Sequence, residues 1–278
     1  MFEVMTLVTL ARSRVAGGWF PAAVWGGGSC GARSRWSEKS MESDRLVLYR
    51  QNLVDENYSG RQIGHLSIAE SRLVRCDFSK SKIKAGSFGG GRRASVYRDC
   101  VFDGMRLNGV HGGYAVFESC SFRNVRITNG WFQNCEFVDC VFTGTLRGVL
   151  FFGAPLSDSV PDLGRTKNRF YGNDFSQARL INVSFRFGVD LSTQRLPKED
   201  EYLYLVDADS VLRKIRKKIR GWSQEVQQEL DSTLSVYELE ASTGQRDLFI
   251  HESLVLGGEF PEARRRLWEL LRSMAVPH

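Results

Sequence analysis

The sequence lacks the features that mark membrane spans, metal centres and the common catalytic sites. No run of apolar residues approaches the about eighteen that a transmembrane helix needs. The four histidines show no metal-ligand spacing, and no Cys–His dyad is evident. The glycine-rich stretch 86–91 lacks the Lys-Ser/Thr ending of a phosphate-binding loop. The sequence therefore predicts a protein that is not an enzyme and that has no cofactor and no bound metal.

Composition places the chain among ordinary globular proteins. Charged residues make up 25% and hydrophobic residues 42% of its 278 residues, so the chain as a whole is neither disordered nor fibrous. The net charge of +6 lies in the middle, because residues 46–190 carry 19 basic and 13 acidic side chains whereas residues 191–278 carry 13 and 15. A surplus of this size does not by itself indicate a nucleic-acid partner.

The first 45 residues do not share the pattern of the rest. They are rich in Gly, Ala, Arg and Trp without a sustained period, and Phe2 and Glu3 precede their short apolar run, which argues against a secretory signal. We expect residues 1–45 to be a disordered or artefactual leader, with Met41 as an alternative start; an organellar leader is the other interpretation. The lack of a secretory signal and of a disulfide pattern favours a cytoplasmic location.

Bulky apolar residues recur at every fifth position in three trains, and the residue two places earlier is often small. The trains run over residues 53–88, 97–142 and 170–185, with Phe152 as an expected continuation of the second. Only Gly112 interrupts the second train, where an aromatic side chain is expected to lean into the gap. The repeating unit is therefore small-x-bulky-x-x.

A period of five fits neither the helix repeat of about 3.6 residues nor the strand repeat of about 2. In extended backbone, residues two apart point the same way, so the bulky residue and its small predecessor both face inward while the remaining residues turn a corner. Four such sides close a square coil of about twenty residues, and successive coils stack at about 4.8 Å. Side chains twenty residues apart then form columns, which predicts a core of Leu53, Ile63, Leu73, Phe78, Ile83, Cys100, Phe102, Phe117, Cys120, Phe122, Phe137, Cys140, Phe142, Phe175 and Phe185.

Several triplets at the small-x-bulky positions resemble the repeats of the pentapeptide repeat family. They are Cys76-Asp77-Phe78, Cys120-Ser121-Phe122, Cys135-Glu136-Phe137, Asn173-Asp174-Phe175 and Ala178-Arg179-Leu180. The resemblance covers about residues 51–187 and implies a right-handed quadrilateral β-helix, in a mainly β domain that we place at residues 46–190. Two breaks in phase, at 89–93 and between Phe152 and Phe170, predict loops that leave the solenoid.

Five of the six cysteines fall on the small inward position: Cys76, Cys100, Cys120, Cys135 and Cys140. We expect them to be small core residues, because buried free cysteine behaves as a small hydrophobic residue. Three of them would form one column, at a spacing that does not by itself forbid a disulfide. A redox or metal-binding column is therefore the functional alternative.

After Phe187 the period of five stops. Residues 191–205 are expected to form a linker, and residues 206–278 a small helical region with a last helix near Pro261 and an apolar stretch at 248–256. The last coil of a solenoid would otherwise expose its apolar floor and an unpaired strand edge. Capping is therefore the simplest role of this region.

One segment of the helical region carries a cluster of positive charge around an apolar stripe. It contains Arg213, Lys214, Arg216, Lys217, Lys218 and Arg220. A basic amphipathic helix attracts phosphate backbones and anionic lipid head groups, whereas the simpler interpretation is the solvated outer face of a capping helix. Arg92 and Arg93, in the first expected loop, are further candidate interaction residues.

Three functions remain open. The leading hypothesis is a non-catalytic protein–protein interaction scaffold with an unidentified protein partner, and a homodimer is compatible with it. The second is an adaptor that binds nucleic acid or an anionic membrane through the basic helix and the Arg92–Arg93 loop. The third follows from the resemblance, since some pentapeptide repeat proteins inhibit type II topoisomerases by imitating DNA. That imitation needs a negative surface, whereas residues 46–190 are net positive.

Overall fold

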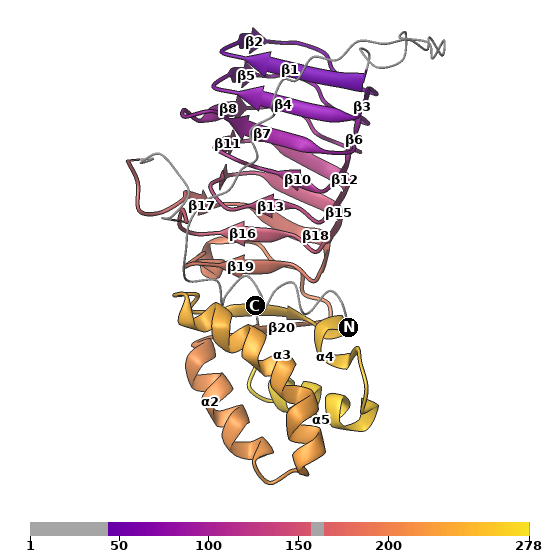
Figure 1. The fold of residues 1–278 in the computed structure, drawn as a ribbon, viewed down its shortest axis with the longest axis vertical. Helices are drawn as coiled ribbons and strands as arrows, with labels where there is room; N and C mark the ends of the chain where they lie inside the picture. The colour runs from indigo at the N-terminus through magenta and orange to yellow at the C-terminus, as the bar shows by residue number, and fades with distance from the viewer. Residues whose placement is uncertain (1–43, 157–163, 278) are drawn as a thin grey trace, which may run out of the picture. The chain divides into compact units, whose positions relative to one another are not determined.

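The structure is a computed structural model that describes residues 44–156 and 164–277. Almost all of the expected leader, including Met41, and the middle of the second expected loop lie outside the described residues. The described residues form a stack of parallel strands followed by helices (Figure 1). The prediction of a β-solenoid with a C-terminal helical region is therefore confirmed.

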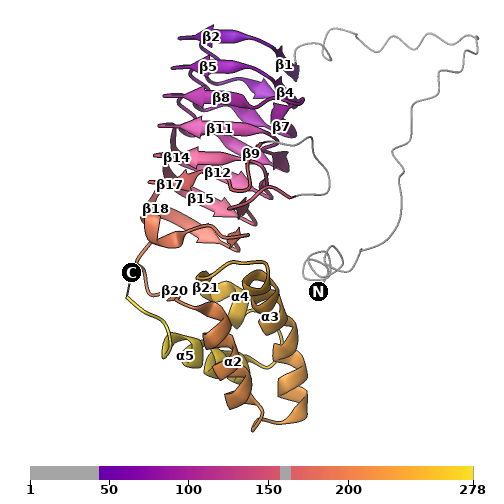
Figure 2. The same cartoon turned by 90° about the vertical axis from the view of Figure 1, so that its left-hand side faces the viewer.

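The strands form three parallel sheets, which we call A, B and C, and each sheet contains every third strand of the solenoid (Figures 1 and 2). Sheet A contains β1 (Arg45–Tyr49), β4 (His65–Ala69), β7 (Gly86–Gly90), β10 (Val110–His111), β13 (Trp131–Phe132), β16 (Leu150–Phe152) and β19 (Ser184–Arg186). Sheet B contains β2 (Asn52–Val54), β5 (Arg72–Val74), β8 (Ser95–Arg98), β11 (Ala115–Glu118), β14 (Glu136–Val138) and β17 (Phe170–Tyr171). Sheet C contains β3 (Gln62–Ile63), β6 (Lys82–Ile83), β9 (Arg106–Asn108), β12 (Ser121–Thr128), β15 (Val141–Arg147) and β18 (Asp174–Ile181).

The coil has a fourth side between sheets B and C. Single parallel bridges join Asn57, Asp77, Val101 and Ser121 in series along this side. At most corners, the residue two places after the bulky residue is in the left-handed region, as at Arg75 with φ 52° and Lys80 with φ 57°. Inward pairs of residues therefore alternate with corners, which explains a period of five.

Inward aromatic rings stack in columns from coil to coil. Phe122 lies between Phe102 and Phe142, with ring centroids 4.6 and 4.7 Å away and interplanar angles of 6° and 5°. A second column contains Tyr97, Phe117 and Phe137 at 4.7 and 4.9 Å. Of the residues expected in the core, all are buried except Leu53, which is partly buried in the first coil.

The expected continuation of the second train at Phe152 is wrong by one residue. Phe132 stacks on Phe151 instead, with ring centroids 5.5 Å apart. The inward residue that precedes Phe151 is Leu146, which lies opposite Ile127. The register shifts between Phe122 and Val125, and Gly144 lies opposite Val125 with φ 92°. This coil therefore has one residue fewer, which a glycine in the left-handed region allows.

Gly112 takes the place of an inward bulky residue in the column of Phe88 and Phe132. A Cβ atom on Gly112 would lie 2.7 Å from Phe132 Cδ1 and 2.0 Å from Cys135 Sγ. Phe132 therefore leans into the space that the glycine leaves, as the sequence predicts.

A small α/β region follows the last coil. It contains the antiparallel strands β20 (Tyr202–Leu205) and β21 (Leu248–His251) and the helices α2 (Ala208–Ile219), α3 (Gln224–Ser242), α4 (Glu252–Leu256) and α5 (Pro261–Arg272). Tyr202, Tyr204 and Phe249 join the same apolar cluster as the solenoid interior. The last coil is thus covered, because this sheet packs against it.

The structure differs from expectation in two segments of this region. The stretch 248–256 begins with strand β21 rather than with a helix, since a short apolar run that is buried on both faces has no periodicity to distinguish the two. Residues 191–205, expected as a linker, include a 3-10 turn at Leu191–Thr193, a bridge from Arg195 to Asp174 and β20. Among the helices described, none is long and apolar enough to cross a membrane.

Candidate interaction surfaces

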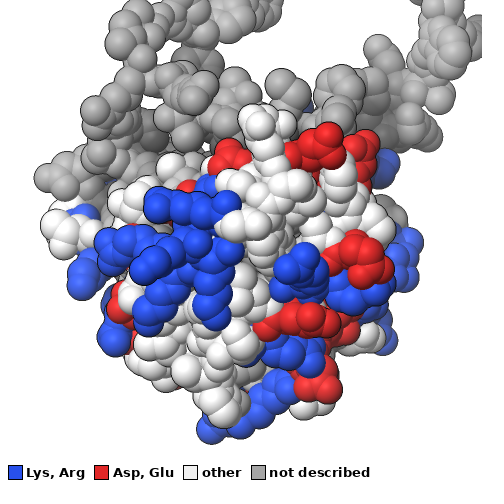
Figure 3. Space-filling view, turned by 90° about the horizontal axis from the view of Figure 1, so that it is seen from below, with Lys and Arg blue, Asp and Glu red and all other residues white. Residues whose placement is uncertain are grey.

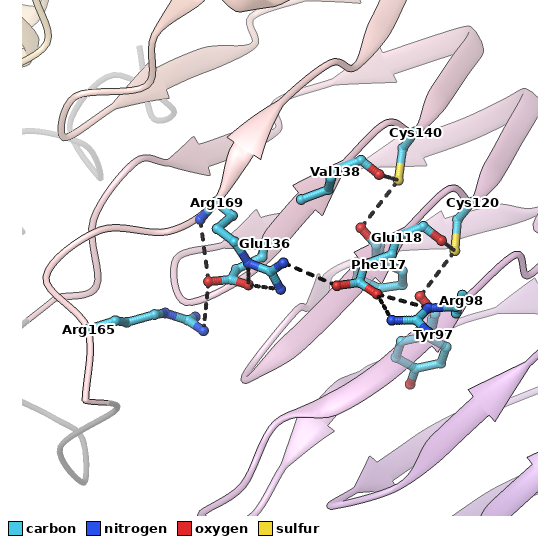
Figure 4. A network of polar contacts seen from close by, with 10 residues as sticks. All are labelled: Tyr97, Arg98, Phe117, Glu118, Cys120, Glu136, Val138, Cys140, Arg165 and Arg169. Atoms are coloured by element: carbon cyan, nitrogen blue, oxygen red, sulfur yellow. Dashed lines mark hydrogen bonds and ion pairs between the residues drawn. The ribbon is translucent and has the colours of Figure 1, made fainter.

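The outer face of sheet B carries a network of paired charges (Figure 4). The register places Arg98 beside Glu118 in neighbouring coils, and their side chains form an ion pair at 2.6 Å. Arg169 bridges Glu118 at 3.2 Å and Glu136 at 2.7 Å, and Arg165 contacts Glu136 at 3.0 Å. The hydrogen bond from Arg98 is the main cause that lowers the pKa of Glu118. These contacts fix the end of the second loop to sheet B.

The first loop is anchored by its backbone. The carboxylate of Glu70 accepts hydrogen bonds from the Arg92 backbone N–H at 3.0 Å and from Arg50 Nε at 2.9 Å. The side chains of Arg92 and Arg93 are exposed and form no ion pair with any described residue. The loop therefore exposes two guanidinium groups to solvent at the corner between β7 and β8.

Helix α2 presents part of its charge to solvent. Its buried residues Val211, Leu212, Ile215 and Ile219 pack in the C-terminal apolar cluster, which directs the basic side chains outward. Arg213 pairs with Asp209 at 2.5 Å, and Arg216 pairs with Asp231 at 2.6 Å and Glu238 at 2.7 Å.

The remaining cations of this helix are Lys214, Lys217, Lys218 and Arg220, which are exposed and form no ion pair within the described part of the chain. Basic side chains gather on one side of this end of the molecule (Figure 3). Two of the six expected basic residues are therefore neutralised locally, and four are available for binding.

The structure does not bring the two groups of candidate residues together. Strands β10, β13, β16 and β19 follow β7 in sheet A, so several coils separate the Arg92–Arg93 loop from α2 (Figure 1). An adaptor that uses both at once would need a ligand that spans this length. The loop and the helix are therefore separate candidate surfaces.

The inward cysteines form a ladder of weak hydrogen bonds. Cys120 Sγ donates to Tyr97 O of the preceding coil at 3.5 Å and to Glu118 O at 3.4 Å, and Cys140 Sγ contacts Phe117 O and Val138 O in the same manner (Figure 4). Cys76, Cys100, Cys120, Cys135 and Cys140 are free and buried. Burial raises the pKa of Cys135 to about 12. Such thiols are poor nucleophiles at neutral pH.

Among the described histidines, His251 lies beside an acidic side chain, with its Nε2 3.5 Å from Glu201 Oε1 and its Nδ1 2.8 Å from Ser253 Oγ. His65 and His111 are both exposed on sheet A. Within residues 44–156 and 164–277, no group of three His, Cys, Asp or Glu side chains lies close enough together to hold a metal ion.

Sequence reasoning missed the outward basic residues of sheet C. Lys82, Arg106 and Arg126 each precede an inward residue and lie side by side in three successive strands. They are far apart in the sequence and do not form a run of charge. Placing them in one column requires the coil register, including the extra residues of the first loop.

No family model matches the sequence, and a search of curated proteins finds no match. Among solved structures, the chain is similar to three forms of QnrB1, which is described as a plasmid-mediated fluoroquinolone resistance protein. One trypsin-treated variant is 18% identical and covers 51% of this chain and 90% of its own, with a TM-score of 0.16. A second trypsin-treated variant is 12% identical and covers 52% of this chain and 87% of its own, with a TM-score of 0.15. The full-length form is 16% identical and covers 55% of this chain and 92% of its own, with a TM-score of 0.16. The β-solenoid fold of this chain is shown by its own strand register.

Proposed function

We propose that this chain is a non-catalytic scaffold that binds a protein partner through the outer faces and loops of its solenoid. The filled interior supports this proposal: inward side chains from Ile63 to Phe185 form one continuous apolar cluster. The five described thiols lie inside this apolar cluster, and most polar side chains lie on the outer faces of the solenoid. Polar groups that are spread over the outside of a solenoid suit recognition over an extended surface.

Sheet B has a composition typical of protein interfaces. Its outer face combines the arginine and glutamate network with two exposed apolar side chains, Val54 at 54% and Tyr171 at 44% exposure. Arginine and tyrosine contribute strongly to protein interfaces, and side chains that are already held in place lose little entropy on binding. The first loop and the described ends of the second loop flank this sheet.

The test is affinity capture from a lysate of the source organism. The wild-type chain is compared with Arg92→Ala/Arg93→Ala and with a variant that replaces residues 156–164 by a Gly-Ser linker of equal length. Lys217→Ala/Lys218→Ala is the matched control, because it also removes two exposed cations. A partner that the wild type and the control capture, and that either loop variant captures at least fivefold less, supports the proposal. Capture that no variant alters contradicts the role of the loops.

A second candidate function is an adaptor that binds an anionic surface through α2. It is favoured by the four exposed cations of this helix that have no acidic partner in the described chain. Each cation near an anionic leaflet contributes about 1 kcal/mol at most, and salt screens the attraction. Imitation of DNA by the solenoid is less compatible with the structure, because sheet C presents basic side chains.

The adaptor is tested with vesicles that contain phosphatidylserine and with neutral vesicles, at low and high salt. We expect the full chain to bind only the anionic vesicles and to dissociate as salt rises, and Lys214→Gln/Lys217→Gln/Lys218→Gln to reduce this binding. Binding that this variant leaves unchanged would exclude α2 as the contact.

A further inference from the structure

Sheet C carries a column of positive charge on its outer face. The strand register pairs Gln62 with Lys82, Lys82 with Arg106, and Arg106 with Arg126. All four side chains are exposed, because each precedes an inward apolar residue in an extended strand. The basic ladder, as we call Lys82, Arg106 and Arg126, thus runs across three consecutive coils.

Further cations border the ladder. Lys80, Lys84 and Arg123 lie at the adjacent corner and strand ends, and all are exposed. Open depressions of the surface are lined in one case by Lys80, Lys82, Arg106 and Arg123 together with one carboxylate, Asp103, and in the other by Lys82, Lys84, Arg106 and Arg126. The ladder is therefore part of a wider basic surface with hollows between its side chains.

This surface has no internal counter-charge comparable to that of sheet B. Strands β3, β6, β9, β12 and β15 contain no Asp or Glu, and the acidic residues near them include Asp103, beside the first depression, and Asp174, at the start of β18. None of the ion pairs of the described residues involves Lys82, Arg106 or Arg126. Those on sheet C lie at its last strand, where Arg179 pairs with Glu201 and Asp174 with Arg195. The same fold thus places a network of paired charges on sheet B and, on strands β6, β9 and β12 of sheet C, three cations that form no ion pair with a described residue.

Stacked like charges oppose folding. Residues that lie opposite each other on neighbouring strands are about 4.8 Å apart along the stack, and like charges at that distance are destabilising. Three cations in register raise the local positive potential, and an anion that binds across them removes the repulsion. The geometry therefore favours a ligand with several negative charges in a row.

We propose that the basic ladder binds the phosphate backbone of duplex nucleic acid. Arginine and lysine, supported by neutral donors such as Gln62, Asn108 and Thr128, are the side chains that contact phosphates and sugars. The aromatic residues of sheet C, such as Phe122 and Phe142, are buried, so the face has no ring on which unpaired bases could stack. None of the exposed large hydrophobic side chains belongs to a described strand of sheet C, so it offers nothing to insert into a bilayer.

The contact does not select a base sequence. A flat sheet face presents its cations at a fixed spacing and inserts no helix or strand into a groove, so it contacts the backbone alone. Backbone contacts of this kind release counterions, so the affinity falls steeply as salt rises. This proposal concerns a different surface from α2 and stands independently of the protein-scaffold function.

The experiment measures fluorescence polarisation of a labelled duplex DNA of 20 base pairs with the full chain, between 50 and 200 mM NaCl. The test variant is Lys82→Gln/Arg106→Gln/Arg126→Gln, and the control is Lys214→Gln/Lys217→Gln/Lys218→Gln, which removes the same number of charges from α2. We expect the ladder variant to bind at least tenfold more weakly at 50 mM, with a log–log salt slope that is smaller by about 2 to 3. The control changes affinity less than twofold.

A single substitution, Arg106→Gln, guards against misfolding of the triple variant. It reduces the salt slope by about 1, and its melting temperature is expected to be no lower than that of the wild type, because the substitution removes like-charge repulsion. Unchanged binding by the ladder variant, or an equal loss in both triple variants, overturns the proposal. Loss only in the α2 variant overturns it in favour of the adaptor function. Tighter binding of polyglutamate than of DNA overturns it in favour of an acidic polypeptide.

Discussion

At the scale of single residues, the interior positions differ in what they tolerate because each has neighbours of fixed identity above and below it. The Phe122 side chain is 3% exposed, and its ring is stacked between those of Phe102 and Phe142. The next residue in the chain, Arg123, is exposed to solvent. Gly112 occupies an inward position whose space is already filled by Phe132 and Cys135. We therefore expect a smaller side chain at Phe122, and a larger one at Gly112, to lower the stability of the fold.

Phe122→Ala is expected to lower the free energy of unfolding by about 3 to 5 kcal/mol, because removal of the ring leaves a cavity in the middle of a column. Arg123→Ala is the control and should change stability by no more than about 0.5 kcal/mol. Urea denaturation of both variants gives the comparison. Equal and small effects of the two substitutions would contradict inward stacking.

Gly112→Ala should destabilise the solenoid by about 1 to 3 kcal/mol, because the new methyl group overlaps Cys135 Sγ and the Phe132 ring. Gly221→Ala is a suitable control, since a Cβ atom there meets nothing nearer than Lys218 O at 4.0 Å. Thermal melting measures both variants. A Gly112→Ala protein as stable as the wild type would mean that the column has room for a further side chain.

At the scale of elements, neighbouring coils are joined differently on different faces. On sheet B, in-register strands place arginine beside glutamate, and the Arg98 hydrogen bond lowers the pKa of Glu118 from its usual value of 4.5. A carboxylate with a lowered pKa stabilises the folded state above that usual value. This contribution is lost as the pH falls through the pKa of the folded state.

Acidification from pH 7 to pH 3.5 should therefore destabilise the wild type more than Glu118→Gln, which has no carboxylate to protonate at this position. Melting temperatures at several pH values measure the slope for each protein. Glu56→Gln is the control, because Glu56 is exposed and forms no ion pair with a described residue. Parallel pH profiles of the wild type and Glu118→Gln would show that the network does not stabilise the fold.

At the scale of the whole molecule, the solenoid needs a partner for its last coil, and the C-terminal region supplies it. The contact is polar as well as apolar. Arg186 of β19, which is partly buried, forms an ion pair with the buried Glu240 of α3 at 3.0 Å. Gln245 exchanges two hydrogen bonds with the backbone of Val189, and the Tyr202 hydroxyl accepts one from the Leu180 N–H. The cap is therefore fixed in register with the solenoid.

Glu240→Ala should lower stability by about 1 to 3 kcal/mol, because it leaves the partly buried Arg186 guanidinium without its partner. The double variant Arg186→Met/Glu240→Leu should recover most of this loss, since apolar residues of similar size replace a buried pair at little cost. Chemical denaturation monitored by circular dichroism distinguishes the two. If the single variant unfolds as the wild type does, the pair contributes nothing to the attachment of the cap.

The sequence by itself determined the coil. The five-residue period fixes which side chains face inward, so residues such as Phe102, Phe122 and Phe142 could be assigned to one column without coordinates. It could not place Phe151 in the core, because the one-residue contraction at Gly144 depends on contact with the backbone of Val125 in the preceding coil. It also could not distinguish the strand at 248–251 from a helix.

Only the tertiary structure decided how the surface charges are grouped. Lys82, Arg106 and Arg126 become neighbours, and Arg98 and Glu118 become a pair, through strand register that is set by the length of every intervening loop. The outward positions have no periodic constraint of their own, so composition reveals only their net charge. Burial selects the inward side chains residue by residue, whereas the arrangement of the outer faces emerges when the coils are stacked.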